Sequence, residues 1–283
     1  MAARTDLALE RINENSYNDS GIHSTVRGNV FRITDIRIDS DSSGRRIGKP
    51  KGKYLTLETT ALSRFSDNYQ EMTEEFSSEL SSFLPSDGPV LIAGLGNSAI
   101  TPDALGPRTA GKILATRHLR QELAEGEADF LRSLRPVSVI QSGVLGQTGI
   151  ETAEIISAVC EKIKPSAVIV IDALACAELS RLGTTIQMCD SGICPGSGVD
   201  NKRLELSEHT LGIPVIAVGV PTVVDLHTVA RAITGQDIPE DSPNMMVTPR
   251  DIDRLIDHAA GMISCGINLA LHPEFTFADA QSL

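Results

Sequence analysis

The sequence has few aromatic residues, no tryptophan and no long apolar run. Aromatic side chains make up 4% of the 283 residues, which argues against the stacking platforms that bind single-stranded nucleic acid. No apolar stretch approaches the roughly 20 residues of a membrane-spanning helix, and the N-terminal sequence MAARTDLALE lacks the apolar run of a signal peptide. We therefore expect a cytoplasmic protein with no membrane contact and no direct nucleic-acid binding.

Familiar catalytic and metal-binding motifs are absent as well. The chain has no G-x-S-x-G elbow, no H-E-x-x-H and no complete Walker-type phosphate loop. Its six histidines show no ligand spacing and its five cysteines form no C-x-x-C pair, so reduced thiols are expected. The sequence predicts no cofactor and no metal, although two carboxylates and a distant histidine leave a divalent ion open.

What is present is an ordinary globular composition with an acidic balance. Hydrophobic residues make up 41% and charged residues 22%, and 37 acidic residues against 25 basic ones give a formal charge of −12. A field of that sign repels phosphate backbones and favours basic partners. A chain of this length can bury a sizeable core in one large domain or two smaller ones.

The N-terminal part is expected to form a small β-containing extension. Residues 1–25 are polar and indicate an exposed arm. Apolar residues predict a strand over Val26–Ile38 with an irregular register, and a second strand over Tyr54–Glu58. The polar run Asp39–Lys53 between them indicates a turn or mobile loop. Apolar residues at four-residue spacing predict a helix over Asp67–Leu84.

A different pattern begins near residue 89. Short apolar runs alternate with helical stretches, which is typical of βαβ units and a parallel sheet covered on both faces. The predicted strands are Pro89–Gly94, Pro136–Ile140, Ala167–Ile171 and Pro214–Val220, with Thr184–Met188 as an additional strand. The predicted helices are Ala104–Arg120, Glu151–Ile163 and Pro249–Asn268. We expect an α/β fold, with a mostly parallel sheet sandwiched by helices, in a single domain over residues 7–283.

Two aspartates fall where such a sheet places its chemistry, beyond the carboxyl ends of the strands. Asp172 directly follows the run VIVI, and Asp103 lies in the loop after the first parallel strand. Because neighbouring strands lie about 4.8 Å apart, the two carboxyl groups can meet. A close pair shares one proton, so that one member activates water while the other polarises a carbonyl or protonates a leaving amine.

Simpler interpretations exist for these residues. An aspartate after a strand is often a helix N-cap or a turn former, although Asp172 stands among apolar residues, where a buried charge needs a reason. Gly94, Gly96 and Asn97 suggest a dinucleotide loop, but the second strand ends without an acidic residue for a ribose. We therefore expect these three residues to shape the turn beside the site.

The loop Asp190–Arg203 is dense in glycine, serine and proline. It is either a plain surface loop or a loop that lines the substrate, in which case Asp190, Ser191 and Gly192 are site residues. Cys194 in the same loop is a poor candidate for a nucleophile, because no histidine stands near it in the sequence.

Longer motifs carry a specific resemblance. They are GLGN and TPDALGP within Gly94–Pro107, GQTGIET at Gly146–Thr152, IDALA at Ile171–Ala175, DSGICPGSGVDNKR at Asp190–Arg203 and LGIPVIAVGVPTVVD at Leu211–Asp225. These segments strongly resemble the germination protease, or spore protease, of bacterial endospores. The resemblance runs over most of the chain from Thr5 onward.

The resemblance implies a fold and an activity that composition and spacing do not reveal. It implies an endopeptidase that degrades small acid-soluble, DNA-coating spore proteins during germination in the spore core. It also implies a homotetramer, and an α/β sandwich similar to that of hydrogenase maturation endopeptidases. The family is proposed to use two aspartates without a metal, and its two motifs carry over to Asp103 and Asp172.

Family members are made as zymogens that process themselves near the N-terminus, at a threonine, an acid, a large apolar residue and an alanine. The sequence Thr5-Asp6-Leu7-Ala8 fits this pattern, so cleavage is predicted between Asp6 and Leu7, with residues 1–6 as a short propeptide. This leader is shorter than those of the family, and so is the segment Leu226–Pro243. Alternative interpretations are a metal-assisted hydrolase that uses the same carboxylates, and a non-catalytic α/β module that binds peptides.

Overall fold

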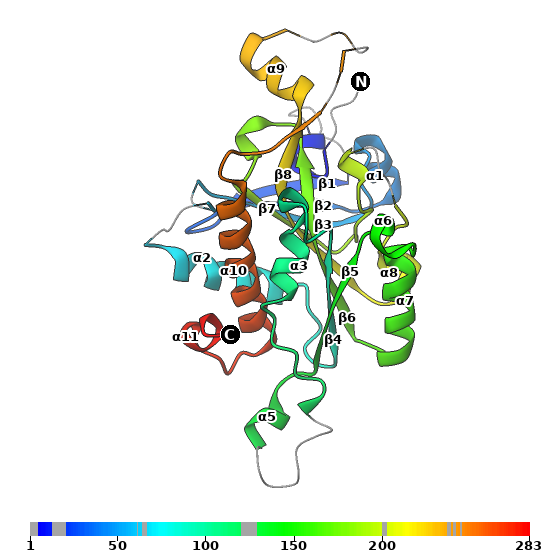
Figure 1. The fold of residues 1–283 in the computed structure, drawn as a ribbon, viewed down its shortest axis with the longest axis vertical. Helices are drawn as coiled ribbons and strands as arrows, with labels where there is room; N and C mark the ends of the chain where they lie inside the picture. The colour runs from blue at the N-terminus through cyan, green and yellow to red at the C-terminus, as the bar shows by residue number, and fades with distance from the viewer. Residues whose placement is uncertain are drawn as a thin grey trace.

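Strands from both halves of the chain join one nine-stranded sheet in the computed structural model (Figure 1). The structure describes residues 5–12, 21–60, 62–63, 67–119, 129–199, 203–236, 239, 242–243 and 245–283. Residues 1–4 of the predicted propeptide and 200–202 of the predicted substrate loop lie outside the described residues, as does Arg120 at the end of a predicted helix.

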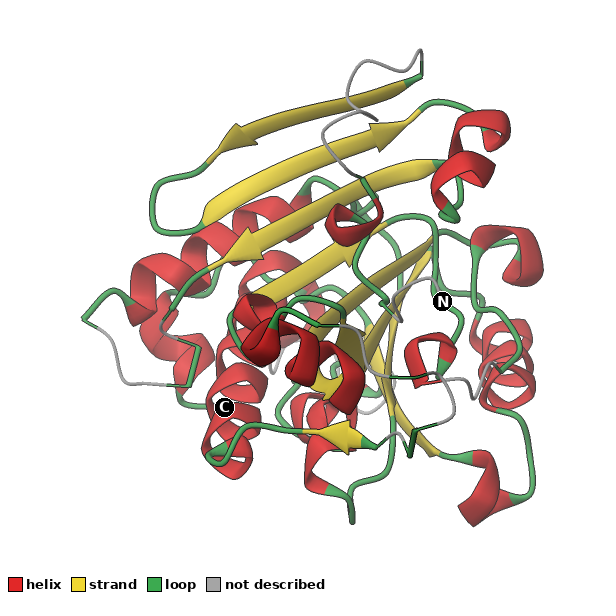
Figure 2. Ribbon diagram, turned by 90° about the horizontal axis from the view of Figure 1, so that it is seen from above, coloured by secondary structure: helices red, strands yellow, loops and turns green. Residues whose placement is uncertain are grey.

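The strands follow the order β1-β2-β3-β7-β8-β6-β4-β5, and β9 pairs with β8. They span Ile22–Arg27 (β1), Arg32–Ile38 (β2), Gly52–Glu58 (β3), Val90–Leu95 (β4), Val137–Gly143 (β5), Ala167–Cys176 (β6), Thr185–Cys189 (β7), Val215–Asp225 (β8) and Met246–Val247 (β9). β8, β6, β4 and β5 are parallel, and the other pairings are antiparallel. Seen from above, the strands rotate progressively across the sheet (Figure 2). The predicted α/β fold with an N-terminal β extension is confirmed.

Helices cover both faces of the parallel strands (Figure 1). They span Asp41–Ile47 (α1), Tyr69–Ser81 (α2), Leu105–Ala110 (α3), Asp129–Ser133 (α5), Leu145–Thr148 (α6), Thr152–Ile163 (α7), Glu208–Leu211 (α8), Leu226–Thr234 (α9), Ile252–Leu271 (α10) and Phe277–Gln281 (α11). Ile169 and Ile171 of β6 belong to the core under α2, α3 and α10, whereas Val168 and Val170 belong to the core under α7. Burial on both faces explains why this strand is apolar throughout.

The described N-terminal residues are not an exposed arm. Leu7 and Ala8 are fully buried, and residues 22–25 belong to β1. The predicted single strand Val26–Ile38 is a hairpin of β1 and β2. Gly28 makes its turn at a φ of +113°, and a Cβ there would lie 2.1 Å from the carbonyl oxygen of Phe31. The glycine that the sequence analysis treated as part of an irregular strand therefore ends one strand.

The predicted loop Asp39–Lys53 contains helix α1. Ser40 caps its N-terminus by accepting a hydrogen bond from the Ser43 amide at 3.2 Å, and Gly48 ends it at a φ of 68°. Both are ordinary signals for the start and end of a helix. The helix has a consequence for the site, because it fixes the position of Lys49 directly after its C-terminal glycine.

Three predicted elements have different lengths in the structure. The helix predicted over Ala104–Arg120 ends at Ala110, where the chain passes through Gly111 into short turns. β6 and β8 are longer than predicted and remain paired as far as Cys176 and Val224. Asp172 therefore lies inside β6 rather than after it.

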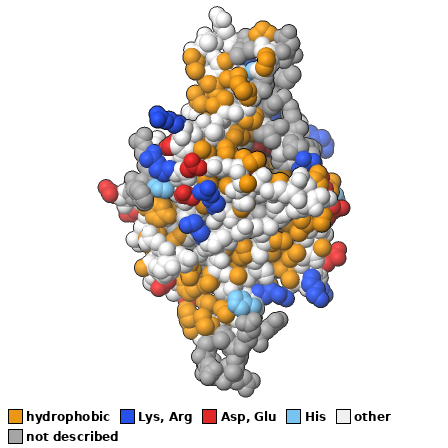
Figure 3. All heavy atoms as spheres, viewed as in Figure 1, with side chains coloured by type: hydrophobic (Ala, Val, Ile, Leu, Met, Phe, Trp, Pro, Cys, Tyr) orange, Lys and Arg blue, Asp and Glu red, His pale blue; other side chains and the backbone are white. Residues whose placement is uncertain are grey.

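Helix α9 projects from the end of β8 (Figure 1) and contributes apolar surface to this end of the molecule (Figure 3). Asp225 begins the helix by accepting a hydrogen bond from the Thr228 amide at 2.8 Å. Ile233 on this helix is 75% exposed. No helix in the described part of the chain combines the length and apolar character that crossing a bilayer requires.

Candidate active site

Asp103 and Asp172 line one cavity at the carboxyl ends of β4 and β6. Its volume is about 420 Å³, and Gly96, Leu174 and Asp6 also line it. We call it the aspartate cavity. The two carboxylates interact electrostatically, since the charge of Asp103 contributes to the raised pKa of Asp172. The structure thus brings together two residues that are far apart in the sequence, as the strand-end argument predicts.

Asp172 occupies a position where β6 outruns one of its neighbours. The parallel pairing with β4 ends at Ile171, and Asp172 itself pairs with Gly219 of β8. The residue is 6% exposed, and its carboxylate accepts a hydrogen bond from the Ala173 amide at 2.9 Å. Burial raises the pKa of Asp172 well above 3.8, and the charges of Asp103 and Asp6 raise it further.

Asp103 is held by the turn that follows β4. Its Oδ2 accepts a hydrogen bond from the Asn97 amide at 2.8 Å. Gly96 has a φ of +108°, and a Cβ there would lie 2.1 Å from the Asp103 carbonyl oxygen. Burial raises the pKa of Asp103, while the hydrogen bond from Asn97 lowers it in part. Gly96 and Asn97 therefore position this carboxylate.

Gly94 acts one step further from the cavity. A Cβ on Gly94 would lie 2.3 Å from the carbonyl oxygen of Gly106, so this glycine lets α3 pack directly on β4. Burial raises the pKa of both aspartates, and the charge of Asp103 raises the pKa of Asp172 further. Carboxyl groups that interact strongly titrate in steps that belong to the pair and not to either residue.

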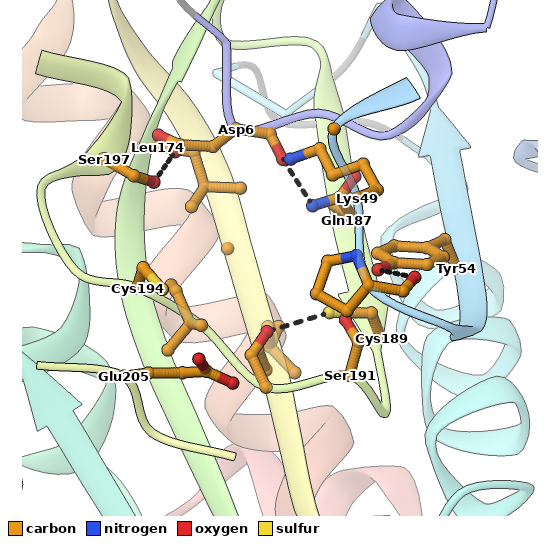
Figure 4. A pocket seen from close by; sticks show the side chains of 17 residues that line it. Asp6, Lys49, Tyr54, Leu174, Gln187, Cys189, Ser191, Cys194, Ser197 and Glu205 are labelled. Atoms are coloured by element: carbon orange, nitrogen blue, oxygen red, sulfur yellow. Dashed lines mark hydrogen bonds between the residues drawn. The ribbon is translucent and has the colours of Figure 1, made fainter. Parts of the chain in front are cut away.

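The N-terminal segment of the chain occupies the same site. The Asp6 amide donates to the carbonyl oxygen of Ala175 at 3.0 Å. In return, the Ala175 amide donates to Oδ2 of Asp6 at 2.9 Å. The Ser197 hydroxyl donates to Oδ1 at 2.7 Å (Figure 4). The segment therefore binds beside the end of β6, and the Asp6 carboxylate has its own set of donors.

Leu7 follows Asp6 into an apolar pocket. Its side chain is fully buried in a cluster with Leu174, Cys176 and Val224. The Leu7 amide donates to the Thr5 hydroxyl at 3.0 Å, and that hydroxyl in turn donates to Glu10. Each residue of the predicted cleavage pattern from Thr5 to Leu7 thus has a defined contact. The exposed arm predicted over residues 1–25 is therefore wrong for Thr5 and Leu7, which are buried.

Asp6 also lines a second cavity of about 340 Å³, and Lys49, Tyr54 and Cys189 are among the other residues that line it (Figure 4). We call it the lysine cavity. The Lys49 ammonium donates to the carbonyl oxygen of Asp6 at 2.6 Å, and the Gln187 side-chain amide donates to the same oxygen at 3.1 Å. Burial lowers the pKa of Lys49, although the nearby charge of Asp6 raises it in part.

Lys49 and Gln187 are not among the site residues predicted from the sequence. Lys49 stands in a run of basic and polar residues, where nothing distinguishes it from its neighbours. Gln187 gives a weak signal, because it is the polar residue in the short strand TIQMC. Only the antiparallel pairing of β3 with β7 brings their regions together.

The predicted loop residues separate into two groups. Ser191 and Gly192 line the lysine cavity, as does Cys194. Asp190 lines neither the lysine cavity nor the aspartate cavity; its carboxylate accepts a hydrogen bond from the Lys53 amide at 2.7 Å and so ties the loop to β3. Within the described residues, no cluster of three or more histidine, cysteine, aspartate or glutamate side chains is placed to hold a metal ion.

Comparisons with known proteins show which family this chain is similar to. The family described as "Germination protease" matches residues 3–237. The germination protease of Clostridium tetani is 39% identical, over 100% of this chain and 99% of the relative. That of Caldanaerobacter subterraneus subsp. tengcongensis is 40% identical, over 100% and 98%. That of Bacillus licheniformis is 37% identical, over 96% and 94%.

Among the solved structures similar to this chain is a nickel–iron hydrogenase maturation protease from Thermococcus kodakarensis KOD1. It is 16% identical, and the match covers 67% of this chain and 98% of that one, with a TM-score of 0.37. A TM-score this low does not establish that the two proteins share a fold.

Proposed function

Because the chain belongs to the germination protease family, we propose that Asp103 and Asp172 together hydrolyse the Asp6–Leu7 bond of its own N-terminus and then small acid-soluble spore proteins. The observation that carries the proposal is the position of Asp6, which lines the aspartate cavity together with both candidate catalytic carboxylates. The peptide bond that fits the family pattern thus follows a residue that borders the same cavity as both carboxyl groups.

The proposed reaction is a hydrolysis by one ionised and one protonated carboxyl group. Asp103, the ionised member, takes a proton from a water molecule whose oxygen attacks the carbonyl carbon of Asp6. Asp172 is more deeply buried and holds the shared proton, which it gives to the Leu7 nitrogen as the carbon–nitrogen bond breaks. The products are an α-carboxyl group on Asp6 and an amine on Leu7, and the proton taken from water restores the pair.

The same position of the N-terminal segment explains how it keeps the protein latent. Uncut, residues 5–8 fill the place that a substrate strand would take. Cleavage leaves a charged amine on Leu7, whose nitrogen is hydrogen-bonded to the Thr5 hydroxyl in the uncut chain. Once the bond is cut, residues up to Asp6 are no longer held to Leu7, which promotes their departure and opens the site to substrates from other chains.

The first test is self-cleavage of the purified full-length chain. We expect incubation to release residues 1–6 and to leave Leu7 as the new N-terminus, as read by intact-mass spectrometry and N-terminal sequencing. The processed protein should then cut a small acid-soluble spore protein. A chain that stays uncut under all conditions, or that is cut elsewhere, contradicts the proposal, and a non-catalytic peptide-binding module then becomes the better interpretation.

Self-cleavage measured in the presence of a chelator distinguishes catalysis by an aspartate pair from catalysis by a metal ion that the same carboxylates hold. We expect the self-cleavage rate to be the same with and without EDTA. Loss of cleavage in EDTA and its return with a divalent ion would assign the two carboxylates to a metal instead.

The pH dependence of self-cleavage should be bell-shaped, with a basic limb above the ordinary carboxyl range. Burial raises the pKa of both Asp103 and Asp172 above 3.8. The rate falls as the pH drops through the lower pKa of the pair, because both groups then carry protons. It also falls as the pH rises through the upper pKa, because both are then ionised. Single-turnover rates across the pH range check this; a basic limb near pH 4, the value of a free carboxyl group (about 4), contradicts it.

The proposal also includes an oligomeric state and a cellular location. We propose a homotetramer in the spore core, as the family resemblance implies. The exposed apolar surface of α9, which includes Ile233, is compatible with assembly, and light scattering on the purified protein measures the oligomeric state directly.

A further inference from the structure

Two side chains from distant parts of the chain converge on a single carbonyl oxygen. Lys49 follows helix α1, and Gln187 belongs to strand β7. Their side-chain nitrogens lie 2.6 Å and 3.1 Å from the oxygen of Asp6, and Figure 4 shows both pointing at it from the lysine cavity. This oxygen belongs to the peptide bond that precedes Leu7, the bond for which cleavage is proposed.

The contact of Lys49 is unusual for a lysine. Lys49 is half-buried, and the partial loss of hydration lowers the pKa of its ammonium. Desolvating a charge is costly, and folded proteins usually offset the cost with a carboxylate partner. In the described part of the chain, the ammonium makes its hydrogen bond to a neutral peptide oxygen, and the charges of Asp6 and Glu10 also act on it.

The Gln187 side chain hydrogen-bonds to the peptide backbone on both sides of the Asp6–Leu7 bond. Its amide nitrogen donates to the oxygen of Asp6, and its amide oxygen accepts a hydrogen bond from the Ala8 amide at 2.6 Å. The side chain therefore sets the position of the Asp6–Leu7 peptide group by two contacts that do not depend on substrate side chains. The carbonyl faces the lysine cavity while Asp6 also lines the aspartate cavity.

We propose that Lys49 and Gln187 form the oxyanion-binding pair of this enzyme. The inference rests on the proposed cleavage of the Asp6–Leu7 bond. When water attacks the carbonyl carbon, the π electrons move onto the oxygen, which becomes a tetrahedral oxyanion. They return when the bond to the Leu7 nitrogen breaks. Fixed donors that already point at this oxygen, one of them a cation, stabilise it more as its charge grows.

The role extends to substrates from other chains. Both contacts are made to backbone atoms, so any peptide segment that binds as residues 5–8 do presents its carbonyl to the same two donors. Lys49 and Gln187 thus complete the site chemically: the carboxyl pair moves protons, and the lysine and glutamine hold the charge that develops on oxygen.

The test measures the rate of self-cleavage in the full-length chain by intact-mass spectrometry. Lys49→Met removes the cation but keeps an apolar stem, and removal of one such donor lowers the rate by about 10²- to 10³-fold. Lys49→Arg restores charge and donors and should recover part of that loss. Lys51→Met, an exposed lysine in the same loop, is the matched control and should cut at the wild-type rate.

Seating of the segment is measured separately, so that a lost contact is not mistaken for lost chemistry. Hydrogen exchange of the Ala8 amide is followed in chains that also carry Asp172→Asn, which keeps them uncut. Lys49→Met should leave this amide protected. Gln187→Glu is the second variant: it keeps the oxygen that accepts from Ala8 but loses the donor, so cleavage should slow while the amide stays protected.

Each outcome has a defined meaning. Slow cleavage in both variants with a protected Ala8 amide supports the oxyanion-binding pair. Cleavage within about threefold of wild type in both, or slow cleavage explained by loss of Ala8 protection, overturns it and leaves the proposed protease function intact. If the unmodified chain does not cut between Asp6 and Leu7 at all, the proposed function fails and this inference fails with it.

Discussion

Replacing Asp172 with asparagine is expected to slow self-cleavage by about 10³-fold or more, since general acid–base catalysis by one positioned group contributes roughly 10²- to 10⁴-fold. Asparagine keeps the shape and polarity of the side chain but cannot hold the transferable proton that the leaving Leu7 nitrogen needs. The measurement is the first-order rate of appearance of the chain that starts at Leu7. A rate within tenfold of wild type would remove Asp172 from the mechanism.

The same substitution is expected to leave stability unchanged or higher at neutral pH. The pKa of Asp172 is raised by burial, so the folded state binds its proton more tightly than the unfolded state does. The wild type therefore loses stability as the pH rises from 3.8 through the raised pKa. Asparagine has no such loss, so thermal unfolding of the variant should match the wild type at low pH and exceed it at neutral pH.

Asp225→Asn is the matched control. Asp225 is another buried aspartate at the end of a central strand, where it accepts hydrogen bonds from the amide and the hydroxyl of Thr228 and caps α9. Asparagine is about as good a helix cap as aspartate, so this variant should fold and cut normally.

The double variant Asp103→Asn, Asp172→Asn should be hardly slower than either single variant. The reason is that the rate losses from groups that act as a unit do not add.

The carboxyl pair could be predicted from the sequence because it depends on short-range features. Each aspartate follows a run that is recognisable as a buried strand, and parallel strands end at one edge of a sheet. The glycine turn around Gly96 and Asn97 was also visible as a site-shaping feature. What the sequence did not reveal is that β6 continues past Asp172, because the apolar run ALAC after it is equally compatible with the start of a loop or a helix.

The other half of the site was not predicted because it depends on long-range pairing. Lys49 reaches Asp6 because helix α1 forms within a run of polar residues. The N-cap of α1 at Ser40 and its C-cap at Gly48 are not part of the sequence prediction. Gln187 depends on β7 lying between β3 and β8. The seating of Leu7 depends on the far ends of β6 and β8, which supply Leu174 and Val224. No local pattern near residue 7 carries this information.

The substitution Leu7→Asp should slow self-cleavage by at least about 100-fold, by a route different from that of Asp172. The Leu7 pocket is formed by Leu174, Cys176 and Val224, whose side chains cannot replace the hydration of a carboxylate. Burying an unpaired charge costs several kcal/mol, and about 1.4 kcal/mol corresponds to each tenfold change in an equilibrium. The segment therefore leaves the site, and its peptide bond no longer meets the carboxyl pair.

Hydrogen exchange distinguishes this loss of seating from a loss of chemistry. In chains that also carry Asp172→Asn, Leu7→Asp should expose the Ala8 amide to exchange, whereas Asp172→Asn alone should leave it bonded to Gln187. Leu7→Met conserves apolar volume, which cores tolerate well, so it should keep both the protection and most of the rate. If Leu7→Asp cuts as fast as Leu7→Met, the pocket does not select the residue after the cleaved bond. The structure then describes a resting position of the N-terminus and not the arrangement in which it is cut.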